Sequence, residues 1–164
     1  MTSDPPPRSD EGRGGRTRAR EVVFRALFEA EASGDDPFEV LELSLGRFRF
    51  TADGHSFARR LAAALGGHAA EVDRLLRELL ERWSLDRVST VARSILRLAV
   101  TELLAVPESP VRVILNEAVR LADRYGEEDA AAFVNGVLDA AARRIRPGSL
   151  DAPMEEEEGK GQVR

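Results

Sequence analysis

The sequence predicts an all-α protein built around one hydrophobic core. Through the middle of the chain, apolar residues recur at the i, i+3, i+4 and i+7 spacing of a buried helix face. Alternation of apolar and polar residues is confined to residues 47–50, where Phe48 and Phe50 alternate with arginines over too few positions to demand a sheet. A length of 164 residues suits about one domain.

Two helices are expected in the N-terminal part of this core. The first covers residues 18–32, and its apolar positions are Val23, Leu27 and Ala30, widened by Phe24 and Phe28. Gly34 ends it, because glycine readily adopts the left-handed conformation that follows many helices. A short second helix follows, in which Asp36 is a capping acid, Pro37 suits the first turn and Glu39 is placed to return the cap.

Two further helices are expected on either side of a glycine pair. Residues 53–65 form the first of them. Gly66 and Gly67 interrupt it before the next helix, because glycine weakens a helix interior. The buried stripe of that next helix is the best marked in the chain and consists of Val72, Leu75, Leu76, Leu79, Leu80 and Trp83.

The last three predicted helices bring the total to seven. The fifth ends at Pro107, since proline cannot continue a helix. The sixth begins near Ser109 or Pro110, where a cap-type residue precedes a proline suited to the first turn, and it ends at Gly126. The seventh is capped by Asp129 and stops before residue 147.

Composition outside the helices divides the chain into one domain with two tails. Residues 1–15 hold three successive prolines and three glycines among charges, which predicts a disordered basic arm. Residues 147–164 contain the acidic run 155–158, which predicts a disordered acidic tail. The helical domain is therefore expected over residues 16–146.

Composition also excludes several classes of protein. The chain has no cysteine, which excludes disulfide frameworks and cysteine-based metal sites and fits a reducing cytoplasm. Its longest apolar stretches, such as residues 103–106, are far shorter than the roughly 20 residues that a membrane span needs. No apolar run near the N-terminus resembles the core of a signal peptide. We therefore expect a cytoplasmic protein.

Catalytic patterns are weak throughout the sequence. His55 and His68 are the only histidines, and neither has a partner at a spacing that suggests a metal site. The sequence contains no glycine-rich phosphate-binding loop of the usual types. We expect no enzymatic activity, no cofactor and no bound metal.

A cluster of basic residues at the start of the first helix is the strongest functional signal. Arg16, Arg18 and Arg20 lie in a stretch without an acid before Glu21. In an extended segment all three would point to one side, whereas in a helix Arg16 and Arg20 would share a face without Arg18. The planar guanidinium suits phosphates and base edges, which indicates RNA; a solubilising surface is the alternative.

Two aromatic residues could stack on bases. Tyr125 stands directly before Gly126, where a helix end meets a loop, and Phe133 lies near the start of the next helix. A place in the core is the alternative for both residues, and the apolar spacing around Phe133 favours it there.

Several segments, in this order and spacing, resemble the NusB family. They are residues 83–88, 95–99, 114–119 and 133–139, together with the Arg18-Ala19-Arg20-Glu21 start. The string Phe133-Val134-Asn135-Gly136-Val137-Leu138-Asp139 is the most specific of them. The resemblance runs from about residue 16 to residue 145. It implies a seven-helix fold of two packed helical subdomains that binds boxA RNA together with NusE, a small-subunit ribosomal protein. The pair would then serve the antitermination complex of RNA polymerase, notably in ribosomal RNA operons.

The resemblance also implies roles for individual residues. On the RNA side it points to Arg16, Arg18, Arg20, Tyr125, Asp129 and Phe133, with Arg97 as an addition. On the NusE side it points to Phe28 and Asp86. Two positions depart from the family pattern: Thr17 interrupts a basic run, and Ala92 stands where an acid is usual. Capping, buried polar pairing or close helix packing is expected to explain Glu21, Asn116, Asn135 and Gly136.

Two other functions stay open at this point. One is a helical protein-protein scaffold or homodimer without a direct RNA role, in which the arginines serve solubility. The resemblance adds that dimerisation of a family member would cover its RNA face. The other is a stand-alone NusB-like module related to the N-terminal domains of RNA cytosine methyltransferases, although the chain leaves no room for a methyl-donor-binding domain.

Overall fold

The computed structural model describes residues 14–151, and this part of the chain is helical without strands. Its elements are α1 (Gly15–Ser33), α2 (Pro37–Arg47), α3 (Ala52–Leu79), the short 3-10 helix η1 (Leu85–Arg87), α4 (Thr90–Ala105), α5 (Val111–Tyr125) and α6 (Ala130–Ile145). The predicted all-α class is confirmed. Residues 1–13 of the predicted arm and residues 152–164 of the predicted tail lie outside the described residues.

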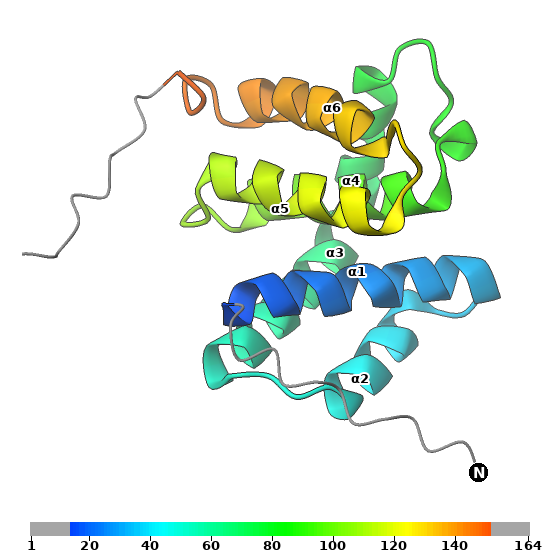
Figure 1. Ribbon diagram of the computed structural model, residues 1–164, viewed down its shortest axis with the longest axis vertical. Coiled ribbons are helices and arrows are strands. Elements are labelled where there is room, and N and C mark those ends of the chain that lie inside the picture. Colours follow the sequence, from blue (N-terminus) through cyan, green and yellow to red (C-terminus); the bar gives the residue numbers. More distant parts are fainter. Residues whose placement is uncertain (1–13, 152–164) are drawn as a thin grey trace, which may run out of the picture.

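The helices form two packed groups, as Figure 1 shows. One group contains α1, α2 and the first part of α3, and the other contains α4, α5 and α6. Helix α4 joins them, because it packs against α1 and α3 as well as against α5 and α6. The long α3 passes behind α1, and the end of α3 reaches α6.

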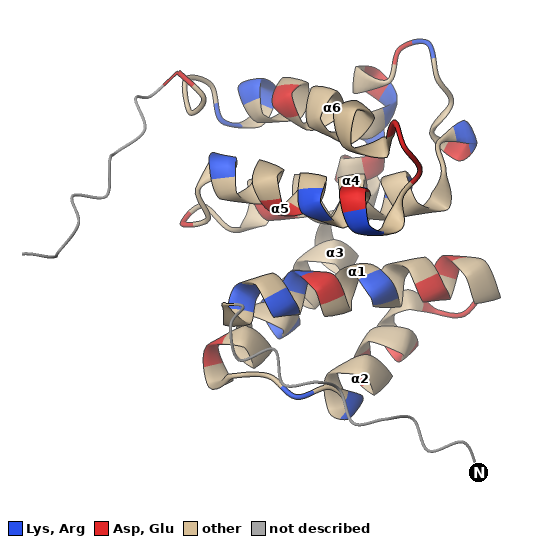
Figure 2. Ribbon diagram, viewed as in Figure 1, with Lys and Arg blue, Asp and Glu red and all other residues tan. Residues whose placement is uncertain are grey.

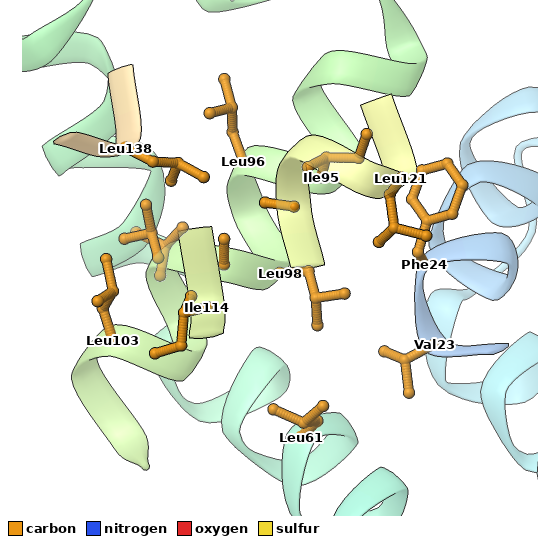
Figure 3. Close-up of a cluster of buried hydrophobic side chains, with 14 of the residues drawn as sticks. Val23, Phe24, Leu61, Ile95, Leu96, Leu98, Leu103, Ile114, Leu121 and Leu138 are labelled. Atoms are coloured by element: carbon orange, nitrogen blue, oxygen red, sulfur yellow. The ribbon is translucent and has the colours of Figure 1, made fainter. Parts of the chain in front are cut away.

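The core follows from the central position of α4. From Ala92 to Leu103 every residue of this helix except Arg97 is buried, as expected for a helix that is packed on all sides. Figure 3 shows its apolar side chains meeting those of the neighbouring helices. The cluster includes Val23, Phe24, Leu61, Ile95, Leu96, Leu98, Leu103, Ile114, Leu121 and Leu138.

The helix ends predicted at Gly34, Asp36 and Gly126 agree with the structure, whereas two predicted side-chain caps do not form. Gly34 has a φ of 78°, and the Asp36 side chain accepts a hydrogen bond from the Phe38 backbone N–H at 2.9 Å, as predicted. The caps expected for the last two helices were wrong. Ser109 is buried and lies one residue before the N-cap of α5. Asp129 stands at the N-cap of α6 in a helical conformation, and its side chain makes no capping hydrogen bond.

The predicted count of seven helices is corrected to six α-helices within residues 14–151, because Gly66 and Gly67 do not interrupt α3. The Phe38 ring of α2 occupies the space that a Cβ on Gly66 would enter. Glycine at this position therefore lets α2 pack closely on α3. Each glycine costs a helix only about 1 kcal/mol, and burial of Leu61, Ala62 and Val72 on the two sides of the pair outweighs that cost.

The apolar stripe of α3 also ends earlier than predicted. The helix stops at Leu79, and Trp83, which the helical spacing placed on the buried face, is 64% exposed. Helical spacing does not predict burial at Trp83, because residues 80–83 leave the helix and form a turn.

At the C-terminal end, α6 is tied to the end of α4 by one arginine. The Arg146 guanidinium donates to the backbone carbonyls of Leu103, Val106 and Ser109 at 3.0, 2.8 and 2.6 Å. The turn that follows stays on the domain, because Leu150 packs against the core and its carbonyl accepts from Arg112 at 3.2 Å. Residues 147–151, which the sequence placed in the tail, thus lie against the helical domain.

Candidate functional site

The basic cluster belongs to a helix from its start, because α1 begins at Gly15. The guanidinium carbons of Arg16 and Arg20 lie 4.6 and 5.0 Å from the centre of the Phe57 ring. Arg18 lies on another side of α1, 5.5 Å from the centre of the Phe48 ring. The helical alternative therefore describes the cluster, with Arg16 and Arg20 on one face and Arg18 on another.

Arg20 is committed to the interior. Its side chain and that of Glu102 on α4 are only 6% and 1% exposed. Its Nη2 donates to Glu102 Oε1 at 2.6 Å, and its Nε donates to Oε2 at 2.9 Å. An RNA contact by Arg20 would leave the buried Glu102 carboxylate unpaired, which is costly in a low-dielectric surrounding. The geometry gives Arg20 a role in joining α1 to α4.

Arg16 and Arg18 remain at the surface. Arg16 Nε donates to Asp53 Oδ2 at 3.2 Å in an ion pair whose side chains are 39% and 66% exposed. Arg18 is partly exposed and makes no ion pair within the described residues. Between them, the Thr17 hydroxyl donates to Glu117 Oε1 at 3.2 Å. The departure at Thr17 therefore supplies a hydrogen bond between α1 and α5.

A groove of about 320 Å³ lies between α1 and α5, and we call it the α1–α5 groove. It is lined by Thr17, Glu21, Glu117, Arg120, Leu121, Asp123 and Arg124. Figure 2 shows basic and acidic segments side by side on this part of α5. The groove can therefore contact a polyanion through its arginines and accept hydrogen bonds through its carboxylates.

Tyr125 closes one end of the contact between α5 and α1. Its hydroxyl donates to Glu21 Oε1 at 2.6 Å, and its ring lies 5.1 Å from that of Phe24 in a tilted arrangement. The Arg124 guanidinium carbon lies 5.4 Å from the same ring. Burial raises the pKa of the Tyr125 hydroxyl, and the hydrogen bond to Glu21 raises it further. The Tyr125 ring already contacts Phe24 and Arg124. A base could therefore stack only on the part of this ring that these two residues leave free.

Asp129 and Phe133 line a different hollow, of about 640 Å³, that also involves Trp83 and Arg87. Phe133 is partly buried against the core, whereas Asp129 is exposed. The loop before α6 is acidic, as Figure 2 shows. Neither Asp129 nor Phe133 lines the α1–α5 groove.

Arg97 lies apart from the other RNA-side candidates. Its Nε and Nη2 donate to the two carboxylate oxygens of Asp73 on α3, at 2.9 and 3.1 Å. Its Nη1 lies 3.6 Å from Glu31 Oε2 near the end of α1. Together with Asp73 it borders an apolar hollow of about 340 Å³ between the first four α-helices. The structure therefore does not bring Arg97 together with Arg16 or Arg18.

The two partner-side candidates are linked through Arg93, which the sequence prediction missed. Arg93 Nη1 donates to the carbonyls of Val88 at 2.9 Å and Asp86 at 3.4 Å, and Nη2 forms an ion pair with Glu31. Glu31 follows Phe28 by about one turn of α1, and Phe28 is 39% exposed. Arg93 therefore fixes the segment of Asp86 to the end of α1 that carries Phe28. Its burial had no signal in the sequence, because the helical spacing places Arg93 on the side opposite the apolar stripe of its helix.

Burial lowers the pKa of Arg93, and the nearby charge of Arg97 adds to this effect. The neighbouring Ala92 is buried, and its N–H donates to the capping Ser89 hydroxyl at 3.2 Å. An acid at position 92 would therefore enter the packed region beside Arg93.

The residues expected to serve only the fold divide into two groups. Glu21 is a buried polar residue that pairs with Tyr125 and with Arg124, whose Nη1 lies 2.8 Å from Glu21 Oε1. Asn116, Asn135 and Gly136 are exposed, and a Cβ on Gly136 would meet no atom within 4 Å. Buried pairing and close packing therefore do not explain these three residues.

Residues 14–151 contain neither a metal-binding cluster nor a membrane-spanning helix. No group of three or more histidine, aspartate or glutamate residues in this part of the chain is arranged to hold a metal ion. None of its helices combines the length and apolar character that a membrane span requires.

Comparison with known proteins assigns the family. The NusB family model matches residues 17–143. Transcription antitermination protein NusB of Sorangium cellulosum is 38% identical over 132 residues, which cover 80% of this chain and 94% of that protein. The protein of the same name from Acidothermus cellulolyticus is 42% identical over 125 residues, covering 76% of this chain and 85% of that protein.

Solved structures give the same result. NusB of T. maritima is 35% identical and superposes with a TM-score of 0.75 over 84% of this chain and 97% of that chain. A structure of the antitermination factors NusB and NusE in complex with double-stranded RNA contains a chain that is 28% identical, with a TM-score of 0.71 over 79% of this chain and 97% of that chain. The chain described here therefore belongs to the NusB family.

Proposed function

We propose that this protein is a transcription antitermination factor that binds boxA-type single-stranded RNA together with NusE. In this proposal it acts in the cytoplasm, within the antitermination complex of RNA polymerase, and supports transcription of ribosomal RNA operons. The observation that carries the RNA role is the exposed arginine surface at the start of α1, where Arg18 has no ion-pair partner among residues 14–151. The relatives named above are antitermination proteins, which agrees with the expectation that the chain is not an enzyme.

On the RNA side, Arg16 and Arg18 contact phosphates, while Arg20 holds α1 in place. Guanidinium groups suit this task because their planar donors match phosphate oxygens. Arg120 and Arg124 line the α1–α5 groove beside these residues, where they pair with Glu117 and Glu21. An RNA strand in this groove would lie against charges from two helices that contact each other.

The remaining RNA-side candidates have supporting roles in this proposal. Tyr125 shapes the groove end through its hydrogen bond to Glu21. Asp129 is exposed and can accept hydrogen bonds from base amino groups, whereas Phe133 offers the exposed part of its ring for stacking. Arg97, paired with Asp73, is the candidate that the geometry supports least.

On the partner side, Phe28 and Asp86 provide one apolar and one acidic contact for NusE. An exposed aromatic ring next to fixed polar groups is typical of a protein interface. The link through Arg93 holds both elements in one arrangement before the partner binds. Pre-organisation of this kind lowers the entropy cost of association.

The proposal is tested by titrating boxA RNA with the full chain, with and without NusE, and measuring fluorescence anisotropy. Arg16→Ala with Arg18→Ala should weaken binding and reduce the dependence of affinity on salt, because two phosphate contacts are lost. The matched control is Arg74→Ala with Arg77→Ala, which removes the same charge from the exposed part of α3. Equal affinities for the two double variants would overturn the assignment of Arg16 and Arg18.

A homodimer is the second candidate, and the exposed Trp83 beside the hollow of Asp129 and Phe133 favours it. A large exposed aromatic at the edge of a hollow is a common feature of interfaces. Sedimentation over a range of protein concentrations, with and without RNA, distinguishes the two. Dimers that RNA dissociates would indicate that dimerisation covers the RNA face.

A further inference from the structure

We propose that Phe48 and the four arginines around it form a second site for RNA backbone, which lengthens the bound strand beyond the boxA-type element. We call this surface the Phe48 patch. It consists of Phe48, Arg18, Arg25, Arg47 and Arg49. This inference rests on the proposed RNA-binding function and adds to it the length and path of the RNA.

Two of the arginines come from one face of α1. Arg18 and Arg25 are seven residues apart, which is about two helical turns, so their side chains lie on the same side of the helix. Their guanidinium carbons lie 5.5 and 5.8 Å from the centre of the Phe48 ring. Cation–π contact with this ring holds both groups in place and lowers the entropy cost of binding a ligand.

The other two arginines flank Phe48 in the sequence. Phe48 follows α2 in an extended conformation, with φ −93° and ψ 147°. Because successive side chains alternate in extended backbone, Arg49 points away from the ring contact that Phe48 makes with α1. Arg47 and Arg49 are both exposed. Arg47, the last residue of α2, and Arg49, in the loop after it, therefore add two exposed cations on either side of Phe48 in the sequence.

The charges of the Phe48 patch are not neutralised within the domain. In the part of the chain that the structure describes, none of its four arginines forms an ion pair. Nearby arginines of α1 and α3 do form ion pairs: Arg16 with Asp53, Arg20 with Glu102 and Arg59 with Glu42. The chain as a whole has a net charge of −5, so this local excess of positive charge is a property of the surface and not of the composition. Clustered unpaired cations favour a polyanion.

The position of the Phe48 patch favours RNA over an acidic protein. Arg18 belongs both to the patch and to the proposed boxA surface, so one strand can pass from the α1–α5 groove to the loop after α2. Figure 2 shows the basic segments of α1, α5 and this loop on the same side of the molecule. The patch offers guanidinium donors and a ring already covered by two of them. It therefore binds phosphates without reading sequence.

The test compares a short boxA RNA with the same RNA extended by about ten uridines on its 5′ or 3′ side, using the full chain at about 0.1 M salt. The extension on one side should raise affinity. Arg47→Ala with Arg49→Ala should remove this gain while leaving the affinity for the short RNA unchanged. For a single strand at this salt concentration each lost phosphate contact is worth about 5-fold, so the loss should be on the order of 10-fold or more.

Two further variants sharpen the result. Arg47→Lys with Arg49→Lys keeps both charges and should keep most of the gain. Arg74→Ala with Arg77→Ala serves as the charge-matched control and should keep all of it. Circular dichroism should show the same helix content for every variant, because all the substituted residues are exposed.

The outcomes separate this inference from the proposed function. If the chain binds the short RNA but gains nothing from either extension, the Phe48 patch is refuted and the boxA surface stands. A gain that the Arg47 and Arg49 alanine variant retains also refutes the Phe48 patch, because the added nucleotides then bind elsewhere on the protein. Failure to bind either RNA, with or without NusE, would overturn both proposals.

Discussion

Arg20→Ala tests the role of the buried ion pair between α1 and α4. The substitution leaves the Glu102 carboxylate, whose side chain is 1% exposed, without the hydrogen bonds that Arg20 donates at 2.6 and 2.9 Å. Removing one partner of a buried pair costs about 3–5 kcal/mol of unfolding free energy. For a chain of this length, each kcal/mol lowers Tm by about 2–4 °C, so Tm should fall by about 6–20 °C.

Urea and thermal unfolding followed by far-UV circular dichroism measure this loss. Arg16→Ala is the matched control, because Arg16 contacts the same Phe57 ring but forms an exposed ion pair with Asp53. It should cost at most about 1 kcal/mol. Equal losses for Arg20→Ala and Arg16→Ala would refute the assignment of a buried structural pair.

A double variant separates stability from RNA binding. Arg20→Met with Glu102→Leu replaces the pair by apolar groups of similar size and should recover most of the lost stability, since such exchanges are often neutral. Its RNA affinity should equal that of the unmodified chain. Loss of RNA binding in a fully folded double variant would show that the Arg20 guanidinium contacts RNA, as the family resemblance implied.

Three other predictions follow from single residues. Tyr125 is the only tyrosine, and its pKa is raised, so tyrosinate absorbance should titrate above about pH 10. The free energy of unfolding should fall as pH rises from about 10 through the folded-state pKa of Tyr125. A titration midpoint at or below the ordinary pKa of tyrosine would contradict the burial and the hydrogen bond. Arg146→Gln should lower the unfolding free energy by about 2–3 kcal/mol in urea titrations, because backbone carbonyls at and after the end of α4 lose a charged donor. A loss within error would show that solvent replaces the Arg146 guanidinium as the donor. Gly67→Ala should raise Tm, because it stabilises α3 by about 0.5–1 kcal/mol. Gly66→Ala should raise Tm less, because its Cβ meets the Phe38 ring of α2. Equal increases in Tm would contradict that packing.

Local sequence patterns predicted the helices well where the information was itself local. Asp36 caps α2 and Gly34 ends α1 because capping depends on residues within a few positions. The break expected at Gly66 did not occur because the deciding contact comes from Phe38, which lies on another helix. The prediction that Trp83 is buried was wrong, because the apolar periodicity does not show where the helix ends.

The candidate site was predictable only in part, for the same reason. Helical spacing separated Arg18 from Arg16 and Arg20, and the ring contacts agree with that separation. The burial of Arg20 depends on Glu102, 82 positions further along the chain, so no local pattern indicated it. Arg97 entered the prediction by resemblance alone, whereas Phe133 was also a candidate because of its aromatic ring near a helix start. The structure places both residues with different neighbours from those of Arg18.

The proposed boxA and NusE surfaces lie toward opposite ends of α1, and each end is fixed to α4 by an arginine ion pair. Near the start of α1, Arg20 pairs with Glu102, and near its end Glu31 pairs with Arg93. Because α4 is buried against every other α-helix of the domain except α2, these pairs set the position of α1 relative to the rest of the protein. The proposed RNA contact at Arg18 and the proposed partner contact at Phe28 are thereby held about three turns apart on one helix. A partner that engages the end of α1 therefore binds a helix whose arginine face is already in position for RNA, and neither surface has to reorganise when the other is occupied.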